Sequence, residues 1–453
     1  MGGGRVEMPW FESLEPVMTT GHRVALLEGG RAFFPALEQA IDAALERVFV
    51  ETYIFHDDPS GLAIARAMVR AAARGVEVHL VVDGFGTPRI TGQVQSVLSD
   101  SAVRVEAFRP EHYRLSPDRQ RLRRLHRKLA VVDGRVAFVG GINLLDDLVH
   151  SRHGGRLESP RVDFAVRVEG PLVAHAHVAM QRLWWELRFV NRSLRRPFGR
   201  AWQSGAGPDR RRRVQDRRRP EAEAPHHTGP ERRQLPDRRV RDGDLGIEMP
   251  ETVVSRIDDG GKQRAMLMLR DNFRHRRRIE RWYLRAIARA RNEVLIANAY
   301  FVPGRRFRRA LIHAAGRGVR VRLLLQGQVE YRLQHWATQA LYDELLRAGI
   351  EIAEYKSSYL HAKVAVIDSQ ATVGSSNLDP FSLLLAREAN VVVDDRDFAQ
   401  ELKHRIEIVI ADGGVPVQLQ HHRRRPWPLR VLNRLAFFVL RLGVSLAGEA
   451  GRY

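Results

Sequence analysis

The alternation of apolar and polar positions predicts strands and helices in an order that occurs twice along the chain. Apolar runs of strand length lie at residues 48–55 (VFVETYIF) and 294–301 (VLIANAYF). After each run, residues 62–73 and 307–317 carry alanine and larger apolar side chains at intervals of three and four, as one face of a helix does. The pattern therefore predicts the same strand and helix in both halves of the chain.

A second pair of matching strands follows these helices. It reads RGVEVHLVV at residues 74–82 and RGVRVRLLL at residues 317–325, and in each copy the glycine closes the preceding helix. Strands that alternate with helices predict a mostly parallel sheet covered by helices. We therefore expect an α/β fold made of two copies of one unit.

A third pair of matching segments interrupts apolar strands with polar residues. Residues 125–147 read LHRKLAVVDGRVAFVGGINLLDD, and residues 360–379 read LHAKVAVIDSQATVGSSNLD. Both contain the pattern His-x-Lys-x4-Asp, formed by His126, Lys128 and Asp133 in the first copy and by His361, Lys363 and Asp368 in the second. Residues two apart on a strand point to the same side, so the histidine and lysine of each copy project together.

A phosphate group is the ligand that two histidines and two lysines are best suited to hold. A buried lysine is costly without an anion beside it, and lysine acts as a point charge on phosphate oxygens. Turns that end in Asn143 and Asn377 follow the two strands, and their small residues let amide donors approach the same anion. A metal fits poorly, because lysine is the nearest neighbour and no second histidine or carboxylate has ligand spacing. A single copy would be interpreted as a satisfied core pair, but its repetition argues against that interpretation.

The composition changes between the two halves. Residues 208–241 hold twelve arginines and six acidic residues and almost no large apolar side chains. Such a segment cannot bury enough apolar surface to fold by itself, so residues 203–263 are predicted to be a disordered linker. Two roles stay open for it, a solvated tether and an electrostatic contact with a polyanion.

The C-terminal residues 421–453 predict a basic amphipathic helix. At 100° per residue, its polar positions form one narrow stripe of Arg430, Arg434, Arg441 and Ser445. Its apolar positions cover the far side: Val431, Leu432, Leu435, Phe438, Val439, Leu442 and Leu446. Two interpretations are open, a helix that lies in the headgroup plane of a membrane and a helix docked on the protein's own core.

The overall charge narrows the choice of partner. The 453 residues include 74 Lys and Arg against 53 Asp and Glu, for a net charge of +21, which predicts an anionic partner such as nucleic acid or acidic lipid. There is no cysteine, so disulfides and thiolate metal sites are excluded. No segment has the pattern of a signal peptide or a transmembrane helix.

The tandem motifs, each followed by G-[GS]-x-N, are similar to those of the phospholipase D superfamily, whose duplicated halves form one active site at their interface. Within it, RDNFRHRRRIERWYLRAI at residues 270–287 and IANAYFVPG at residues 296–304 resemble the shorter, B-type bacterial cardiolipin synthases. The resemblance implies two α-β-α halves that form a pseudo-dimer. We expect the parts of the chain to be a first half at 1–202, the linker at 203–263, a second half at 264–420 and the tail at 421–453.

The same resemblance implies a two-step mechanism without metal or cofactor. His126 is expected to attack phosphorus as a neutral imidazole, while His361 protonates the departing glycerol and then deprotonates the incoming hydroxyl. Lys128 and Lys363 would hold the phosphate together with Asn143 and Asn377.

Carboxylates complete the site that the resemblance implies. Asp163 and Glu388 match the acids that orient the histidine of the opposite half. Asp133 and Asp368 belong to the family's catalytic motif, although their position five residues beyond the lysines favours support of the strand and its loop.

The expected function is transfer of a phosphatidyl group between two phosphatidylglycerol molecules, giving cardiolipin and glycerol. The expected partner is an anionic phospholipid surface on the cytoplasmic face of the bacterial inner membrane, to which the protein binds peripherally, and no nucleic acid is expected. A phosphodiesterase or nuclease of the same superfamily remains the alternative, and the positive charge would suit it. A non-catalytic lipid-binding scaffold is less consistent with two intact motifs.

Overall fold

The structure is a computed structural model. It describes residues 16–109, 123–150, 155–193, 261–270, 277–379 and 386–447, without the side chains of residues 189–193 and 443–447. The predicted linker lies outside the described residues up to position 260, and so does the end of the tail after position 447.

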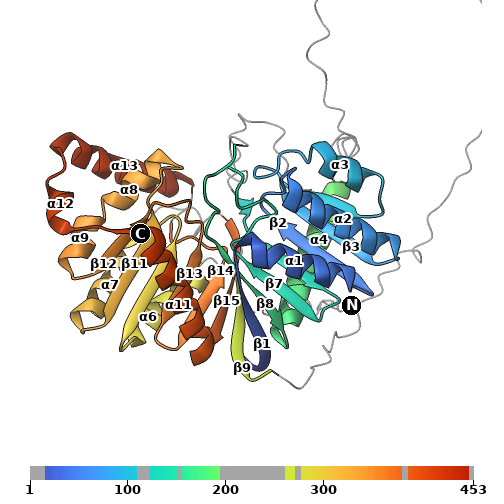
Figure 1. The fold of residues 1–453 in the computed structure, drawn as a ribbon, viewed down its shortest axis with the longest axis horizontal. Helices are drawn as coiled ribbons and strands as arrows, with labels where there is room; N and C mark the ends of the chain where they lie inside the picture. The colour runs from blue at the N-terminus through green and yellow to red at the C-terminus, as the bar shows by residue number, and fades with distance from the viewer. Residues whose placement is uncertain are drawn as a thin grey trace, which may run out of the picture. The chain divides into compact units, whose positions relative to one another are not determined.

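The first lobe contains the elements β1 to α4 (Figure 1). Its strands are β1 (Thr19–Glu28), β2 (Arg47–Thr52), β3 (Glu77–Asp83), β4 (Arg104–Phe108), β5 (Arg124–Leu125), β6 (Lys128–Val132), β7 (Val136–Gly140) and β8 (Phe164–Glu169). Its helices are α1 (Gly29–Asp42), α2 (Pro59–Ala73), α3 (Gly92–Ser99) and α4 (Leu172–Ser193).

The second lobe contains the elements β9 to α13. Its strands are β9 (Gln263–Arg270), β10 (Glu293–Asn298), β11 (Arg320–Gln326), β12 (Glu351–Tyr355), β13 (Lys363–Ile367), β14 (Gln370–Gly374), β15 (Ala386–Asp394) and β16 (Gly414–Pro416). Its helices are α6 (Arg278–Arg289), α7 (Arg305–Gly316), α8 (Arg332–Gln339), α9 (Tyr342–Arg347), α11 (Arg396–Gly413), α12 (Leu419–Arg423) and α13 (Trp427–Ala447). Strand β9 begins at the last residue assigned to the linker.

The strands of both lobes form one continuous sheet whose two halves have the same order. From the central pair β1·β9, one half runs β1-β8-β7-β6-β2-β3-β4 and the other runs β9-β15-β14-β13-β10-β11-β12, with β16 at the outer edge. Helices α4 and α11 share one apolar core with the sheet, while α6 and α7 belong to a second core. The duplicated α/β architecture predicted from the repeated patterns is confirmed.

The prediction of a mostly parallel sheet is wrong. Only β2-β3-β4 and β10-β11-β12 pair in parallel, and the other ladders between neighbours in the continuous sheet are antiparallel. The physical reason is the length of the connections. Turns at Asp133 and Asp368 join β6 to β7 and β13 to β14 within three residues or fewer, and a parallel crossover needs about a dozen or more.

The C-terminal helix α13 packs on α8 by a face that the apolar pattern did not single out. Ala436 and Leu440 are buried against Ala337 of α8 and Val302, and the side-chain amide of Asn433 donates to the Gln339 side chain at 3.4 Å. The docking face of this helix therefore combines the small Ala436 and the polar Asn433 with Leu440 and the partly buried Phe437.

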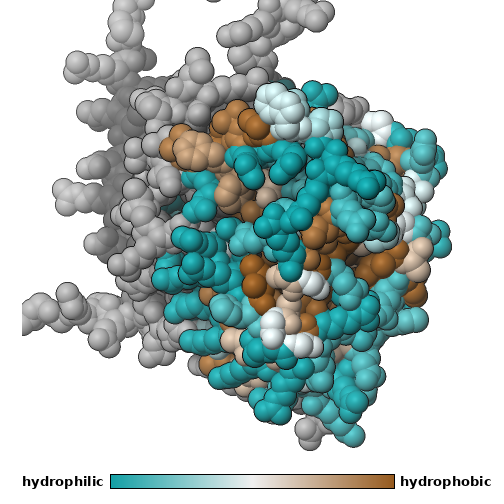
Figure 2. All heavy atoms as spheres, turned by 90° about the vertical axis from the view of Figure 1, so that its left-hand side faces the viewer, coloured by the Kyte–Doolittle hydropathy of each residue, from teal (hydrophilic) through white to brown (hydrophobic). Residues whose placement is uncertain are grey.

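Most of the larger apolar residues of α13 face away from the protein. The exposed ones are Trp427, Leu429, Val431, Leu435, Phe438, Val439 and Leu442, here called the exposed apolar row. Figure 2 views the molecule from the side on which α12 and α13 lie, and hydrophobic patches are visible there among hydrophilic side chains. Within the described part of the chain, no helix has the length and hydropathy required to cross a bilayer.

Candidate active site

The two histidines lie where backbone segments of one lobe pair with the other lobe. The amide of His126 donates to the carbonyl of Arg387 at 3.0 Å, and the amide of His361 donates to the carbonyl of Val162 at 2.8 Å. Strand β5, directly before His126, pairs in parallel with the start of β15. Each histidine is thus fixed by hydrogen bonds to the opposite lobe, so the site requires both halves.

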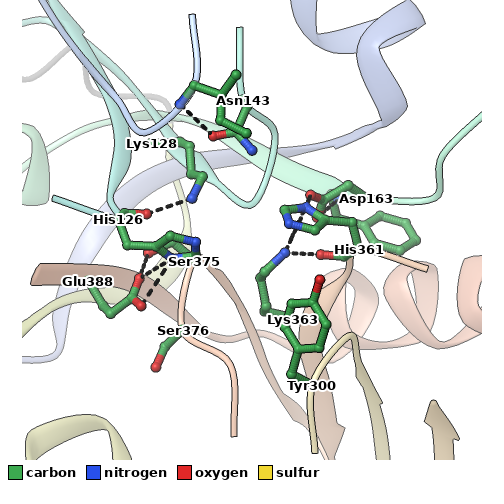
Figure 3. A network of polar contacts seen from close by, with 12 residues as sticks. His126, Lys128, Asn143, Asp163, Tyr300, His361, Lys363, Ser375, Ser376 and Glu388 are labelled. Atoms are coloured by element: carbon green, nitrogen blue, oxygen red, sulfur yellow. Dashed lines mark hydrogen bonds and ion pairs between the residues drawn. The ribbon is translucent and has the colours of Figure 1, made fainter. Parts of the chain in front are cut away.

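The first ring is held by a glutamate of the second lobe. Nδ1 of His126 lies 3.1 and 3.2 Å from the two carboxylate oxygens of Glu388, which is fully buried on β15 (Figure 3). The hydroxyl of Ser375 donates to the same carboxylate at 2.5 Å. A carboxylate only accepts hydrogen bonds, so Nδ1 carries the proton and Nε2 is the free nucleophilic nitrogen.

The second ring has the same arrangement in the opposite direction. Nδ1 of His361 lies 2.5 Å from a carboxylate oxygen of Asp163, which precedes β8 in the first lobe. The Lys363 ammonium lies 2.8 Å from the same ring nitrogen and 3.7 Å from Asp163. Asp163 therefore accepts the Nδ1 proton while its charge also compensates the buried lysine.

Both lysines are buried beside the histidines. Lys128 donates to the carbonyl of His126 at 2.7 Å, and its ammonium lies 5.3 Å from the ring centre of Tyr53. Lys363 donates to the carbonyl of His361. Burial lowers the pKa of Lys128 to about 7 and that of Lys363 to about 8. Burial removes the water that would stabilise the ammonium charge. A bound phosphate would stabilise that charge instead.

Burial also keeps the histidines neutral. It lowers the pKa of His361 to about 3, reinforced by the charge of Lys363, and it lowers the pKa of His126 as well. Burial alone would raise the pKa of Glu388, but the contacts with His126, the charge of Lys128 and the hydrogen bond from Ser375 together outweigh burial, and the pKa is lowered. The pKa of Asp163 is lowered in the same way against burial, chiefly by Lys363 and then by His361. The site thus pairs ionised carboxylates with neutral imidazoles.

A single cavity of about 450 Å³ opens onto both histidines. The predicted asparagines Asn143 and Asn377 line it, and the Asn143 side-chain oxygen accepts a hydrogen bond from the amide of Ile54 at 3.2 Å. Figure 3 shows the two rings and the two lysines directed toward the same space. Among the residues that the structure describes, no three His, Asp or Glu side chains form a group suited to a metal.

The structure does not bring Asp133 and Asp368 to this cavity. Asp133 accepts hydrogen bonds from the amides of residues 45, 46 and 47 at 2.9, 2.9 and 2.8 Å, at the far end of β6. Asp368 does the same for residues 291, 292 and 293 at 2.8, 3.0 and 2.9 Å. Both carboxylates therefore hold the turn before a neighbouring strand. Asp133 and Asp368 were predicted among the catalytic residues, and the structure places them instead as supports of these turns.

Some residues that shape the site were not predicted from the sequence. Ser375 orients Glu388, and its first-lobe counterpart is Gly141, where a Cβ atom would lie 2.2 Å from a carboxylate oxygen of Asp163. The small residues of both turns are part of the sequence prediction, but it draws nothing from the difference between GGIN and GSSN. That difference was a usable signal, since the longer Glu388 and the shorter Asp163 need different neighbours.

Other unpredicted residues line the cavity itself. They are Tyr53, Ile54, Phe85, Arg124, Leu145, Arg161, Tyr300, Glu330, Tyr331, Gln334, Asp379 and Ala386. No motif marks them, because they come from the ends of several strands and from loops that only the folded chain brings together.

Two α/β lobes that each supply a histidine, a lysine and the acid for the opposite histidine define a phospholipase D-like protein. A family model described as "Cardiolipin synthase, PLD-like domain" matches residues 37–153 and 283–409, one segment in each lobe. The chain belongs to this family of cardiolipin synthases.

Individual relatives agree with the family model. The chain is 35% identical to cardiolipin synthase B of Escherichia coli (strain K12) over 429 residues, which are 94% of this chain and 90% of the relative. It is 28% identical to cardiolipin synthase A of Pseudomonas putida (strain GB-1), over 85% of this chain and 68% of that one. The crystal structure of phosphatidylserine synthase from Haemophilus influenzae Rd KW20 covers 96% of both chains with a TM-score of 0.61 at 11% identity, a likeness of fold alone.

Proposed function

We propose that this protein is a cardiolipin synthase, which transfers a phosphatidyl group from one phosphatidylglycerol molecule to another and releases glycerol. The observation that carries this proposal is the pair of cross-lobe His–carboxylate contacts, His126–Glu388 and His361–Asp163, on one cavity. Family membership and the names of the similar proteins support the choice of lipid substrate.

The first step forms a covalent intermediate. The donor phosphate lies between the ammonium groups of Lys128 and Lys363, and Nε2 of His126 attacks phosphorus. As the new N–P bond forms, the bond from phosphorus to the glycerol oxygen breaks, and that oxygen takes a proton from Nε2 of His361. Glycerol leaves, and the phosphatidyl group remains on His126.

The second step reverses these roles for a new alcohol. A headgroup hydroxyl of a second phosphatidylglycerol gives its proton to the now neutral His361 and attacks phosphorus. The O–P bond forms, the N–P bond breaks, and His126 is free again. Cardiolipin is the product, and His361 has regained the proton that the next cycle needs.

His361 must be protonated for the first step, although its pKa in the empty site is about 3. Burial and the nearby charge of Lys363 cause that low value. A bound phosphodiester brings one negative charge to the same ammonium group and so offsets its effect on the ring. Substrate binding thus raises the pKa of His361 and prepares the acid only when there is a phosphate to cleave.

The exposed apolar row of α13 is the proposed contact with the membrane. Arg430 and Arg434 follow one edge of this row, so apolar insertion and attraction to anionic headgroups act on the same side of the helix. Helix α13 packs on α8, whose Gln334 lines the cavity. Binding on the cytoplasmic face of the inner membrane would hold the cavity close to its lipid substrates.

The reaction is tested with purified protein, isotope-labelled phosphatidylglycerol in vesicles and, separately, plasmid DNA. Labelled cardiolipin is expected from the unaltered protein, and His126→Ala and His361→Ala should each lower its formation by about 10³-fold or more. His404→Ala, which removes an exposed histidine on α11, is the matched control. Cleavage of plasmid with no lipid product, or normal synthesis by either variant, would contradict the proposal.

The membrane contact is tested by flotation with vesicles that contain phosphatidylglycerol. Leu435→Glu combined with Phe438→Glu should reduce the bound fraction at least tenfold, because two carboxylates replace exposed apolar side chains beside an anionic surface. Ile408→Glu changes an equally apolar, 44% exposed residue on α11 and should leave binding unchanged. Equal losses of vesicle binding in both variants would show that α13 has no special role in membrane contact.

A further inference from the structure

The cavity between the histidines has two walls that the duplication relates to each other. The bridge between Phe55 and Leu144 in the first lobe repeats as the bridge between Phe301 and Leu378 in the second. In both lobes, the residue before the phenylalanine and the residue after the leucine line the cavity. The two walls can therefore be compared position by position.

These equivalent positions differ in polarity. Ile54 precedes the bridge in the first lobe, whereas Tyr300 precedes it in the second. Leu145 follows the bridge in the first lobe, whereas Asp379, only 2% exposed, follows it in the second. Two apolar side chains of the first lobe thus correspond to a phenol and a carboxylate in the second lobe.

A third difference lies beyond the ends of β3 and β11, where Thr87 and Glu330 occupy equivalent places. Thr87 bonds the backbone of its own lobe, accepting from the amide of Phe55 at 2.9 Å. Glu330 instead lines the cavity and accepts a hydrogen bond from the Tyr300 hydroxyl at 2.5 Å. Burial, reinforced by the charge of Glu330, raises the pKa of Tyr300 well above its usual value, so the phenol keeps its proton.

We propose that this polar second-lobe wall is the subsite for the glycerol headgroup, taking first the leaving glycerol of the donor and then the headgroup of the acceptor. The proposal rests on the function proposed above. Glycerol offers several hydroxyl donors, and the carboxylates of Glu330 and Asp379 accept such bonds. The same carboxylates repel a phosphate, which stays between Lys128 and Lys363.

The two apolar positions of the first lobe have the complementary role, beside the first-lobe polar residues Tyr53, Arg124, Asn143 and Arg161 that also line the cavity. The side chains of Ile54 and Leu145 line the cavity and offer no hydrogen bonds to glycerol hydroxyls. The phosphatidyl side of the scissile bond is therefore assigned to this part of the cavity. The difference in polarity at these equivalent positions therefore orients a substrate that the duplicated catalytic groups alone would accept in either direction.

This orientation also assigns the two histidines independently of the family resemblance. Figure 3 shows Tyr300 next to Lys363, on the side of the site that carries His361. Glycerol bound there has its bridging oxygen nearest to His361, which gives that oxygen a proton as the P–O bond breaks. The N–P bond then forms to His126, on the opposite side of phosphorus, and the acceptor hydroxyl returns its proton to His361.

The test is a competition between two acceptor alcohols in one reaction. Unlabelled phosphatidylglycerol is supplied with equal amounts of isotope-labelled glycerol and 1-propanol, which lacks the additional hydroxyls. Mass spectrometry measures the ratio of labelled phosphatidylglycerol to phosphatidylpropanol. The unaltered protein should prefer glycerol, and Tyr300→Phe and Glu330→Gln should each reduce this preference about tenfold. Asp379→Leu, which copies the first lobe, should act in the same direction.

A matched control exists in the same lobe. The hydroxyl of Tyr342 donates to the carboxylate of Glu354 at 3.1 Å, and neither residue lines the cavity, so Tyr342→Phe should leave the ratio unchanged. The ratio is internal to each sample, so a partly unfolded variant still gives a valid result. An unchanged ratio in Tyr300→Phe and Glu330→Gln would overturn the subsite. Failure of the unaltered protein to transfer to any alcohol would instead contradict the proposed function.

Discussion

The two lobes share one catalytic arrangement but differ around it. Each presents a lysine from the start of an equivalent strand and a histidine two residues before it, and each lends a buried acid to the histidine of the other lobe. The lobes differ in the length of that acid, in the turn beside it and in the polarity of the equivalent cavity positions compared above. The parts that both steps of the reaction need are duplicated, and the parts that distinguish one end of the substrate from the other are not.

The turn beside each acid offers the most severe test of this comparison. Gly141→Ser should lower turnover about 10²-fold or more, because the added Cβ would lie 2.2 Å from the Asp163 carboxylate and displace it from His361. The reciprocal change, Ser375→Gly, removes one hydrogen bond to Glu388 and should cost about tenfold at most.

Steady-state kinetics on phosphatidylglycerol vesicles measure both variants. A thermal melt of each variant separates loss of activity from loss of folding. Equal losses of turnover in Gly141→Ser and Ser375→Gly would mean that the two turns are interchangeable. That result would contradict the difference between the lobes.

The lysines should give the site a characteristic pH dependence. Burial lowers the pKa of Lys128 to about 7 and that of Lys363 to about 8, so both lose the charge that binds phosphate as the pH rises through this range. We expect kcat/KM to fall about tenfold per pH unit between the two values and up to about 100-fold per pH unit above both, since kcat/KM reports ionisations of the free enzyme. The profile is measured with vesicles between about pH 5 and about pH 10, roughly two units below the lower value and two units above the higher one.

Lys128→Arg separates the contributions of the two lobes. Arginine stays charged throughout this range, so the earlier part of the decline should disappear even if the absolute rate is lower. A profile that is flat up to pH 10 for the unaltered protein would show that neither lysine titrates as described.

The smallest effect on turnover is expected at the two aspartates that end the motif. Asp133→Ala and Asp368→Ala each remove the acceptor for three backbone amides and should lower the free energy of unfolding by roughly 1–3 kcal/mol, by similar amounts in the two lobes. Activity per folded molecule should stay the same. Denaturant titration and kinetics at low temperature measure the two quantities, and a large fall in kcat without loss of stability would place these carboxylates in the chemistry.

Repetition made the centre of the site predictable. His126 and His361 were recognisable because the same polar interruption of an apolar strand occurs twice, and the family resemblance then pointed to Asp163 and Glu388. Tyr300 and Glu330 could not be found in this way, because a search for repeated residues passes over positions at which the halves differ. Their proximity depends on loops that follow separate strands.

The sequence predicted the helices and strands better than it predicted whether neighbouring strands run parallel or antiparallel. The helix at α2 and the strands around it follow from local patterns, whereas strand direction depends on connection length, and the short turns at Asp133 and Asp368 were not weighed. The docking of α13 depends on Ala436 and Leu440, and a count of apolar positions does not distinguish these from the exposed apolar row. Which face docks is decided by the shape of α8, which the tail sequence does not contain.

The most direct test is to identify the residue that carries the phosphatidyl group during turnover. The protein is mixed with phosphatidylglycerol, quenched with alkali within milliseconds to seconds, digested and mapped by mass spectrometry. The account predicts a phosphatidyl adduct on His126 and none on His361. An adduct on His361, or full turnover with no adduct on either histidine, would contradict it.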